Sequence, residues 1–251
     1  MNRLISILFW FYLIVVSVLL FPIAALLRLL TLWDVRASAN HAFSRLWSFF
    51  YSAINPYWSM TIEGKEKIDS AQTYVLVANH NSFIDILVLY YLPIHFKWVA
   101  KDSLFKVPFF GWNMGLSRYI AIRRGDEASK KALFKTVNLW LFRKVSVLFF
   151  PEGTRSLDGK LKPFKPGAFK AAIESGVKIL PIVLTGTRDA LPARSLIFSH
   201  KAFMKLTVLE AIDPALIHED DLIIKTNILM SQTHIAMSEA LKVLPESQLL
   251  S

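Results

Sequence analysis

The sequence predicts an α/β domain with a mainly parallel or mixed sheet covered by helices, and an N-terminal membrane-associated helical segment ahead of it. Short β-rich runs alternate with helix-like stretches after about residue 60, which is the pattern of strands joined by crossover helices. A long uncharged apolar stretch comes first. The 251 residues show no internal repeat. We therefore expect membrane-anchoring helices at 1–60 and one domain at 61–251.

The composition indicates a membrane partner. Hydrophobic residues make up 54% of the chain and the mean hydropathy is +0.41, above the usual range for a soluble domain. The net charge of +10 suits an anionic partner, either nucleic acid or acidic lipid headgroups. The apolar excess favours the lipid. The chain has no cysteine, which excludes disulfides, thiolate zinc sites and a cysteine nucleophile.

The first expected element is a helix over the uncharged stretch Leu4–Leu27. At about 1.5 Å per residue it would be roughly 36 Å long, enough to cross a hydrocarbon core of about 30 Å. A cleaved signal peptide is the alternative, although its apolar region is normally only about 7–15 residues long. Arg3 precedes the stretch, whereas Arg28, Arg36 and Arg45 follow it. The positive-inside rule therefore places the rest of the chain on the cytoplasmic side of the cytoplasmic (inner) membrane.

A second helix is expected between Arg36 and Met60, where no acidic residue occurs. Large apolar residues recur there at helical spacing, namely Phe43, Trp47, Phe50, Ile54 and Trp58. Arg45 and small polar residues lie between them, which suits a helix at the membrane interface. Packing on the protein's own core is the alternative. Pro22 leaves open a hairpin that enters only one leaflet.

The following part of the chain supplies the sheet. Strands are expected at 74–78, 96–100, 119–122, 145–150 and 179–185 because these runs are short, apolar and β-rich. Helices are expected at 126–144, 167–175 and 226–243. Functional side chains in such sheets gather in the loops beyond the strand ends. Two polar loops that follow predicted strands are therefore candidates for the functional site.

The first polar loop, Asn79 to Asp85, follows the strand at 74–78. Residues five apart on a helix point about 140° away from each other, so His80 and Asp85 cannot share a face if both are helical. They can meet if His80 lies in a turn ahead of a helix that starts near Ser82. Asp85 could then hold one imidazole nitrogen while the other takes a proton from a substrate hydroxyl. The alternative is structural, with Asn79 and Ser82 as turn and N-cap residues.

The second polar loop runs from residue 149 to residue 156. Pro151 ends the strand, and Gly153 allows a positive φ or the close approach of a ligand. Thr154 and Arg155 offer hydrogen-bond donors, so the loop could cradle a phosphate. An ordinary turn with a solvated arginine is the alternative. Four lysines follow at 160, 162, 165 and 170, a run typical of a solvated face or, near a membrane, of a contact with anionic lipid.

Taken in order, these segments resemble the motif blocks of the glycerolipid acyltransferase family. The blocks are Asn79-His80-x4-Asp85, Arg123-Arg124, Phe150-Pro151-Glu152-Gly153-Thr154-Arg155-Ser156 and Ile179-Leu180-Pro181-Ile182. The resemblance covers roughly residues 61–186. The members that look closest are the bacterial 1-acyl-sn-glycerol-3-phosphate (lysophosphatidic acid) acyltransferases.

The resemblance implies specific site residues and an activity. His80 and Asp85 would be catalytic, and the acyl acceptor would be bound by Arg124, Glu152, Gly153, Thr154 and Arg155. A fatty acyl group would pass from acyl-CoA or acyl carrier protein to the free hydroxyl of the lysophospholipid 1-acyl-sn-glycerol-3-phosphate, forming phosphatidic acid in phospholipid biosynthesis. Family members commonly have an acidic or amide residue where this chain has Arg123. Another lysolipid or glycerol 3-phosphate therefore stays open as the acceptor.

The chemistry of acyl transfer agrees with these residues. A thioester is already activated, so the enzyme must supply a deprotonated hydroxyl and donors for the oxyanion. No acyl-enzyme is needed, and a G-x-S-x-G elbow is absent because the segment 115–119 breaks it. No Walker loop, H-E-x-x-H pair or paired C-x-x-C occurs, so we expect no metal and no cofactor. A non-catalytic basic module that binds membranes or nucleic acid is the alternative, which the intact His80 and Asp85 argue against, and we expect no nucleic-acid partner.

Overall fold

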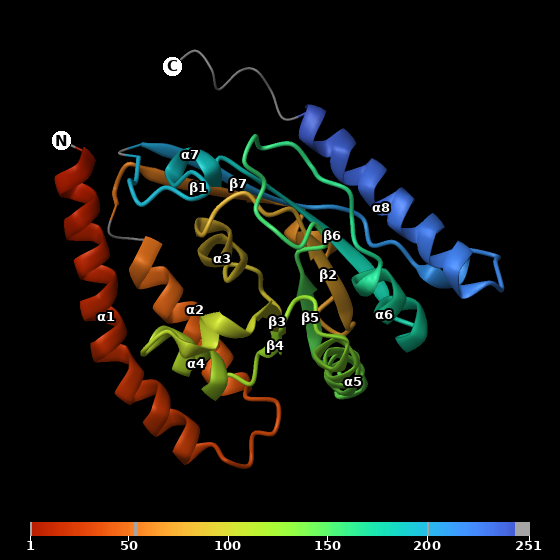
Figure 1. The fold of residues 1–251 in the computed structure, drawn as a ribbon, viewed down its shortest axis with the longest axis horizontal. Coiled ribbons are helices and arrows are strands. Elements are labelled where there is room, and N and C mark those ends of the chain that lie inside the picture. The colour runs from red at the N-terminus through yellow and green to blue at the C-terminus, as the bar shows by residue number, and fades with distance from the viewer. Residues whose placement is uncertain (1, 53–54, 200, 244–251) are drawn as a thin grey trace.

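The protein is described by a computed structural model that covers residues 2–52, 55–199 and 201–243 (Figure 1). Seven strands form one sheet in the order β1-β7-β6-β2-β5-β3-β4. Neighbouring strands pair in parallel, except for β6 and β7, which are antiparallel. The predicted fold class, a mainly parallel or mixed sheet covered by helices, is confirmed.

The strands are β1 (Trp58–Glu63), β2 (Tyr74–Ala78), β3 (Phe96–Lys101), β4 (Ile120–Ile122), β5 (Ser146–Phe149), β6 (Lys178–Thr185) and β7 (Ala202–Val208). The five predicted strands correspond to β2 through β6. β1 and β7 were not predicted, and they pair with each other in parallel at one edge of the sheet. Their burial alternates between neighbouring residues, as in strands with one exposed face.

The helical spacing predicted through Trp58 is wrong at its end, because Trp58 begins β1. Pairing with β7, distant in sequence, decides the conformation of Trp58 over its local spacing. Ile54 lies outside the described residues. The predicted division between residues 60 and 61 falls within β1 and stays a prediction.

The helices are α1 (Asn2–Leu30), α2 (Ser38–Ser52), α3 (Ile84–Leu89), α4 (Phe110–Leu116), α5 (Glu127–Phe142), α6 (Gly167–Ser175), α7 (Thr187–Ala190) and α8 (Leu222–Val243). Three 3₁₀ turns lie at Lys65–Lys67, Asp102–Lys106 and Pro214–Leu216. α5 starts where Asp126 caps it by accepting a hydrogen bond from the Ser129 amide at 3.0 Å. α6 ends at Gly176, which has a left-handed φ of 62°.

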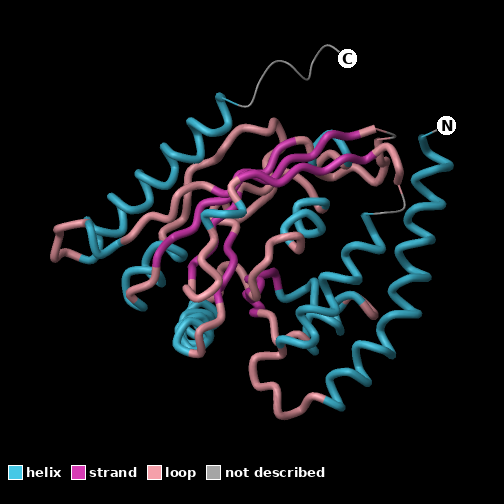
Figure 2. The backbone as a smooth tube through the Cα atoms, turned by 180° about the vertical axis from the view of Figure 1, so that it is seen from behind, coloured by secondary structure: helices cyan, strands magenta, loops and turns pink. Residues whose placement is uncertain are grey.

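The helices cover the sheet on two sides. α1, α2, α3 and α4 lie on one face, and α5, α6 and α8 lie on the other (Figures 1 and 2). The central strand β2 is buried throughout and contributes to both cores, with Leu76 on the first face and Val75 and Val77 on the second. The loop that follows β2 is therefore anchored by packing on both sides.

α1 lies along the side of the domain over its whole length (Figures 1 and 2). Near its start, the rings of Phe9 and Phe198 have centroids 4.3 Å apart, and near its end the Asn40 side chain donates to the Ala24 carbonyl at 3.0 Å. Its opposite side is apolar and exposed, as at Ile7 and Leu19. Within the described residues, α1 is the helix that is long and apolar enough to cross a membrane, so the predicted N-terminal apolar helix is confirmed.

α2 turns its small polar residues toward the domain. The Ser48 hydroxyl donates to the Leu87 carbonyl at 3.0 Å, and Trp47 is buried. Leu46 and Phe50 are exposed. The predicted single aromatic face is therefore divided, because Trp47 packs into the core while Phe50 stays outside.

Candidate active site

Four strands end at one edge of the sheet, and the loops that follow them form a site. β2 leads into the turn that holds His80, β5 into the loop 150–156, β4 into Arg124 and β6 into Thr187. These strands belong to the parallel part of the sheet, so their carboxyl ends meet. The tertiary structure thereby brings together three sequence blocks predicted to carry the chemistry.

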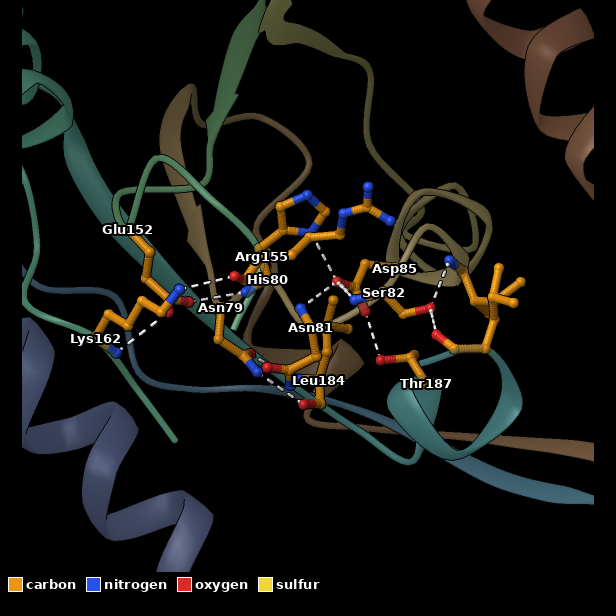
Figure 3. Close-up of polar contacts among 12 residues, drawn as sticks. Asn79, His80, Asn81, Ser82, Asp85, Glu152, Arg155, Lys162, Leu184 and Thr187 are labelled. Carbon is orange, nitrogen blue, oxygen red and sulfur yellow. Dashed lines mark hydrogen bonds and ion pairs between the residues drawn. The ribbon is translucent and has the colours of Figure 1, made fainter. Parts of the chain in front are cut away.

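His80 and Asp85 contact each other through a turn ahead of α3 (Figure 3). The His80 Nδ1 atom lies 2.8 Å from Asp85 Oδ2, and Asp85 is fully buried. The same carboxylate accepts the backbone amides of Asn81 and Ser82 at 2.6 and 2.8 Å and the Thr187 hydroxyl. A carboxylate only accepts, so His80 donates from Nδ1 and its Nε2 is left as a base. Nε2 has no hydrogen-bond partner among the described residues.

The turn is held in place by two side chains, Asn79 and Ser82, that hydrogen-bond to backbone groups. Asn79 is buried, and its amide nitrogen donates to the Leu184 carbonyl at 2.9 Å while its carbonyl accepts from the Leu184 amide at 2.7 Å. The Asn79 side chain thus continues the pairing of β2 with β6 beyond the strand. Ser82 donates to the Leu191 carbonyl at 2.6 Å and accepts from the Ile84 amide at 3.1 Å, which holds the turn that precedes α3.

The second loop holds the main chain of His80. Glu152 Oε1 accepts the His80 amide at 2.9 Å, and the Ser156 amide donates to the His80 carbonyl at 2.7 Å. Glu152 Oε2 accepts the Lys162 amide at 3.1 Å. Burial raises the pKa of the Glu152 carboxyl, and the two amides act against that rise. The Phe150 ring stacks on the imidazole at 3.9 Å. Glu152 is therefore placed to position His80, with both its oxygens occupied.

The arginines at the site differ in whether they already have a partner. Arg123 lies 3.3 Å from an Asp102 oxygen and 3.6 Å from an Asp126 oxygen. Arg124 and Arg155 are exposed, and within the described residues neither guanidinium has a hydrogen bond or ion pair. Arg155 extends on the same side as the His80 ring (Figure 3). Two of the predicted acceptor-binding residues are thus free to bind an anion.

Gly153 and Thr154 determine the conformation of the loop and its contacts with the lysines that follow. Gly153 has a φ of +73°, and a Cβ there would lie 2.8 Å from Lys165 Nζ. Any side chain at this position would be strained and would displace the lysine. Lys162 Nζ donates to the Arg155 carbonyl at 2.7 Å and lies 3.4 Å from Thr154 Oγ1. The lysines after the loop therefore support it and add positive charge beside His80.

A cavity of about 630 Å³ opens at these residues. Aromatic and aliphatic side chains line its interior, including Trp98 and Met114, while His80, Arg124 and Lys165 lie on its lining as well. A lining that combines apolar side chains with basic groups suits a ligand that has an apolar chain and an anionic head.

Thr187 was not predicted as a site residue. It is fully buried and donates to Asp85. The available signal was its place two residues beyond the predicted strand at 179–185, where strand-end loops carry functional side chains. Its contact with Asp85 could not be foreseen, because the two residues are distant in the sequence.

Residues 59–185 match the Acyltransferase protein family. The chain is 40% identical over 159 residues to a 1-acyl-sn-glycerol-3-phosphate acyltransferase of Chlamydomonas reinhardtii, an alignment that covers 63% of this chain and 47% of the relative. It is 39% identical over 161 residues to a chloroplastic 1-acyl-sn-glycerol-3-phosphate acyltransferase of Arabidopsis thaliana, covering 64% and 45%. The chain thus spans about half the length of these two relatives.

A bacterial relative is covered more fully. The 1-acyl-sn-glycerol-3-phosphate acyltransferase of Helicobacter pylori (strain J99) is 34% identical over 166 residues, covering 64% of this chain and 70% of the relative. Among solved structures, the 1-acyl-sn-glycerophosphate acyltransferase of Thermotoga maritima has a TM-score of 0.75 at 20% identity and covers 98% of this chain and 100% of that chain. That likeness shows a shared fold.

Proposed function

Because the chain belongs to the Acyltransferase family, we propose that it transfers a fatty acyl group from a thioester to the free hydroxyl of lysophosphatidic acid, forming phosphatidic acid. The donor is acyl-CoA or acyl carrier protein. One observation supports the proposal above the others: the Asp85-bound imidazole of His80 lies on the lining of an apolar cavity that Arg124 also lines. A base, a place for an acyl chain and a free cation for a phosphate are thereby combined.

The geometry supports direct transfer without an acyl-enzyme. His80 Nε2 takes the proton of the acceptor hydroxyl, and the resulting oxygen nucleophile attacks the thioester carbonyl. Collapse of the tetrahedral intermediate breaks the C–S bond, and the imidazolium returns its proton to the leaving thiolate. The buried Asp85 carboxylate stabilises the imidazolium between these two steps. Arg124 and Arg155 hold the acceptor phosphate so that its hydroxyl is aligned with His80.

We also propose that α1 inserts into one leaflet instead of crossing the membrane. A spanning helix would carry its first residues away from the domain. In this structure Trp10 donates to the Leu196 carbonyl at 2.9 Å, and the Phe198 amide donates to Ser6 at 2.9 Å. Detaching α1 would break these contacts, whereas insertion along the membrane plane keeps them and buries the exposed apolar side in lipid. The domain then lies on the cytoplasmic side of the cytoplasmic membrane, where the thioester donors are found.

An acceptor panel tests the proposed activity. Purified protein in detergent is assayed with lysophosphatidic acid, lysophosphatidylcholine and glycerol 3-phosphate, with acyl-CoA or acyl carrier protein as the donor. We expect lysophosphatidic acid to be acylated fastest. His80→Ala should lower kcat about 10²–10⁴-fold, while a matched variant of the exposed His218, His218→Ala, should keep wild-type rates. Near-normal turnover by His80→Ala would contradict the mechanism, and preference for another acceptor would contradict the assigned substrate.

A further inference from the structure

A second cavity, of about 400 Å³, lies between α1 and the segment 104–110. On the α1 side it is lined by Trp10, Leu13 and Ile14, and on the other side by Val107, Pro108 and Phe109. We call this cavity the α1 groove. The Ser17 and Tyr51 hydroxyls, which are among its few polar groups, hydrogen-bond to each other. The groove therefore suits a hydrocarbon chain and offers no site for a charged group.

The α1 groove adjoins the cavity that contains His80. Leu104 and Phe110 contribute to the lining of both cavities. Phe83, within the turn that joins His80 to Asp85, also lines the groove, and its ring centroid is 6.1 Å from that of Phe110. A chain lying in the groove would thus end beside the residues of the proposed dyad.

The groove opens on the side of the protein that we expect to face lipid. Ile14 on one wall is 59% exposed and Val107 on the other is 43% exposed. Phe109, which lines the groove, has a positive φ of 60°, which is unfavourable for a bulky residue. Its ring packs against Phe21 of α1 at 5.8 Å and Trp112 at 5.2 Å. These contacts hold the second wall of the groove in place against α1.

We propose that the α1 groove binds the acyl chain that the lysophospholipid acceptor already carries, while the larger cavity receives the chain of the donor. This inference rests on the proposed function. The transfer places two acyl chains on neighbouring carbons of one glycerol, and two adjoining apolar cavities beside His80 suit such a product. The acceptor comes from the membrane, and the groove is the compartment beside α1. The free arginines then hold the phosphate at the other end of the same molecule.

Photo-crosslinking locates the resident chain directly. Full-length protein in vesicles of phosphatidylethanolamine and phosphatidylglycerol receives lysophosphatidic acid with a diazirine at the end of its chain, and labelled residues are identified by mass spectrometry. We expect labels on the groove walls at 10–17 and 104–110. Labels at Tyr90 or Met114, in the larger cavity, would overturn the proposal. Labels confined to the outward side of α1, such as Leu19, would also overturn it, since the chain would then stay in the bilayer.

Filling the groove supplies a kinetic test that does not depend on one variant. Ile14→Trp and Val107→Trp fill it from opposite walls, and Leu19→Trp is the control, because Leu19 is 64% exposed on α1 and does not line the groove. Each groove variant should lower kcat/KM for a long-chain lysophosphatidic acid roughly tenfold, the loss expected when about two CH2 groups of the chain are kept out of the groove. The donor KM and the rate with a short-chain acceptor should not change.

The two proposals fail in different ways. Groove variants that match the Leu19→Trp control with the long-chain acceptor would refute the assignment of the groove while transfer to lysophosphatidic acid continues. Wild-type protein that does not acylate lysophosphatidic acid would instead refute the proposed function.

Discussion

Replacing Asp85 with asparagine should separate the charge of the dyad from its geometry. In the wild type, Oδ2 accepts from His80 and from two backbone amides, and Oδ1 accepts from the Thr187 hydroxyl. An asparagine can keep its oxygen at the Oδ2 position and retain all three of those bonds. Its amide group then faces Thr187, whose hydroxyl can accept as well as donate. The site should therefore keep its shape in Asp85→Asn.

The loss of charge sets the size of the kinetic effect. His80 Nδ1 and Asp85 Oδ2 are 2.8 Å apart, which puts the centres of charge of an imidazolium and a carboxylate at about 4 Å. Two unit charges at about 4 Å interact by about 4 kcal/mol at an effective dielectric constant of about 20. This attraction develops only when His80 is protonated, so it lowers the transition state. We expect Asp85→Asn to lower kcat by up to about 10³-fold.

Two measurements made side by side test this reasoning. Acyl transfer to lysophosphatidic acid gives kcat and KM, and thermal unfolding followed by circular dichroism in detergent gives Tm. We expect a large fall in kcat, little change in acceptor KM and a Tm close to that of the wild type. Thr187→Val serves as a control that removes one neutral donor and leaves the charge. A fall in kcat of less than about tenfold would refute the electrostatic role of Asp85. A Tm well below that of the wild type would refute the claim that the site keeps its shape.

Three further predictions follow from contacts at the site and in the core. Arg155→Ala should lower acceptor kcat/KM about 10–150-fold, as expected for a lost charge-assisted phosphate contact. Arg123→Ala should change it little because Arg123 already has carboxylate partners. Equal effects of the two variants would contradict the binding of the acceptor phosphate by Arg155. Glu152→Gln should lower Tm and kcat with little change in acceptor KM. The NH2 group of the glutamine would face one of the two backbone amides that now donate to the Glu152 carboxylate. A change confined to KM would instead support acceptor binding. Burial lowers the pKa of Lys97 from 10.5 to about 7, so between pH 7 and pH 10.5 the Lys97 side chain binds more protons in the unfolded chain than in the folded one. The Tm of the wild type relative to that of Lys97→Met should therefore rise with pH in this range. A Tm difference that is constant across pH would refute this.

Some parts of this structure were predictable because they depend on neighbours in the sequence. The strands β2 to β6 are short β-rich runs, and each contains enough apolar residues to be placed by composition alone. The turn ahead of α3 was predictable because His80 and Asp85 are five positions apart, a spacing at which two residues of one helix cannot share a face. The free state of Arg155 and the positive φ of Gly153 agree with the loop that the residue types indicate.

Other features depended on partners far along the chain. The role of Glu152 in binding the acceptor stays a prediction. What the sequence did not indicate is that its carboxylate accepts the His80 amide, a contact that joins two loops only after β2 and β5 have paired. β1 exists because β7 lies beside it, and the sequence spacing near Trp58 indicated a helix instead. The same reason explains why Thr187 was missed.

The fold class could be predicted from the sequence because the strand and helix patterns are local in the chain. The family could be predicted because its motif blocks occur here in order, whereas the role of His80 as the base stays a prediction. Contacts in the folded chain, in contrast, place α1 along the domain, with Trp10 hydrogen-bonded to the Leu196 carbonyl, and leave a groove between α1 and the segment 104–110. Hydropathy measures how readily a helix enters lipid, but it carries no information about which side of the helix packs on protein. That choice is made by contacts such as the one between Phe9 and Phe198, which form only when residues distant in the chain are brought together.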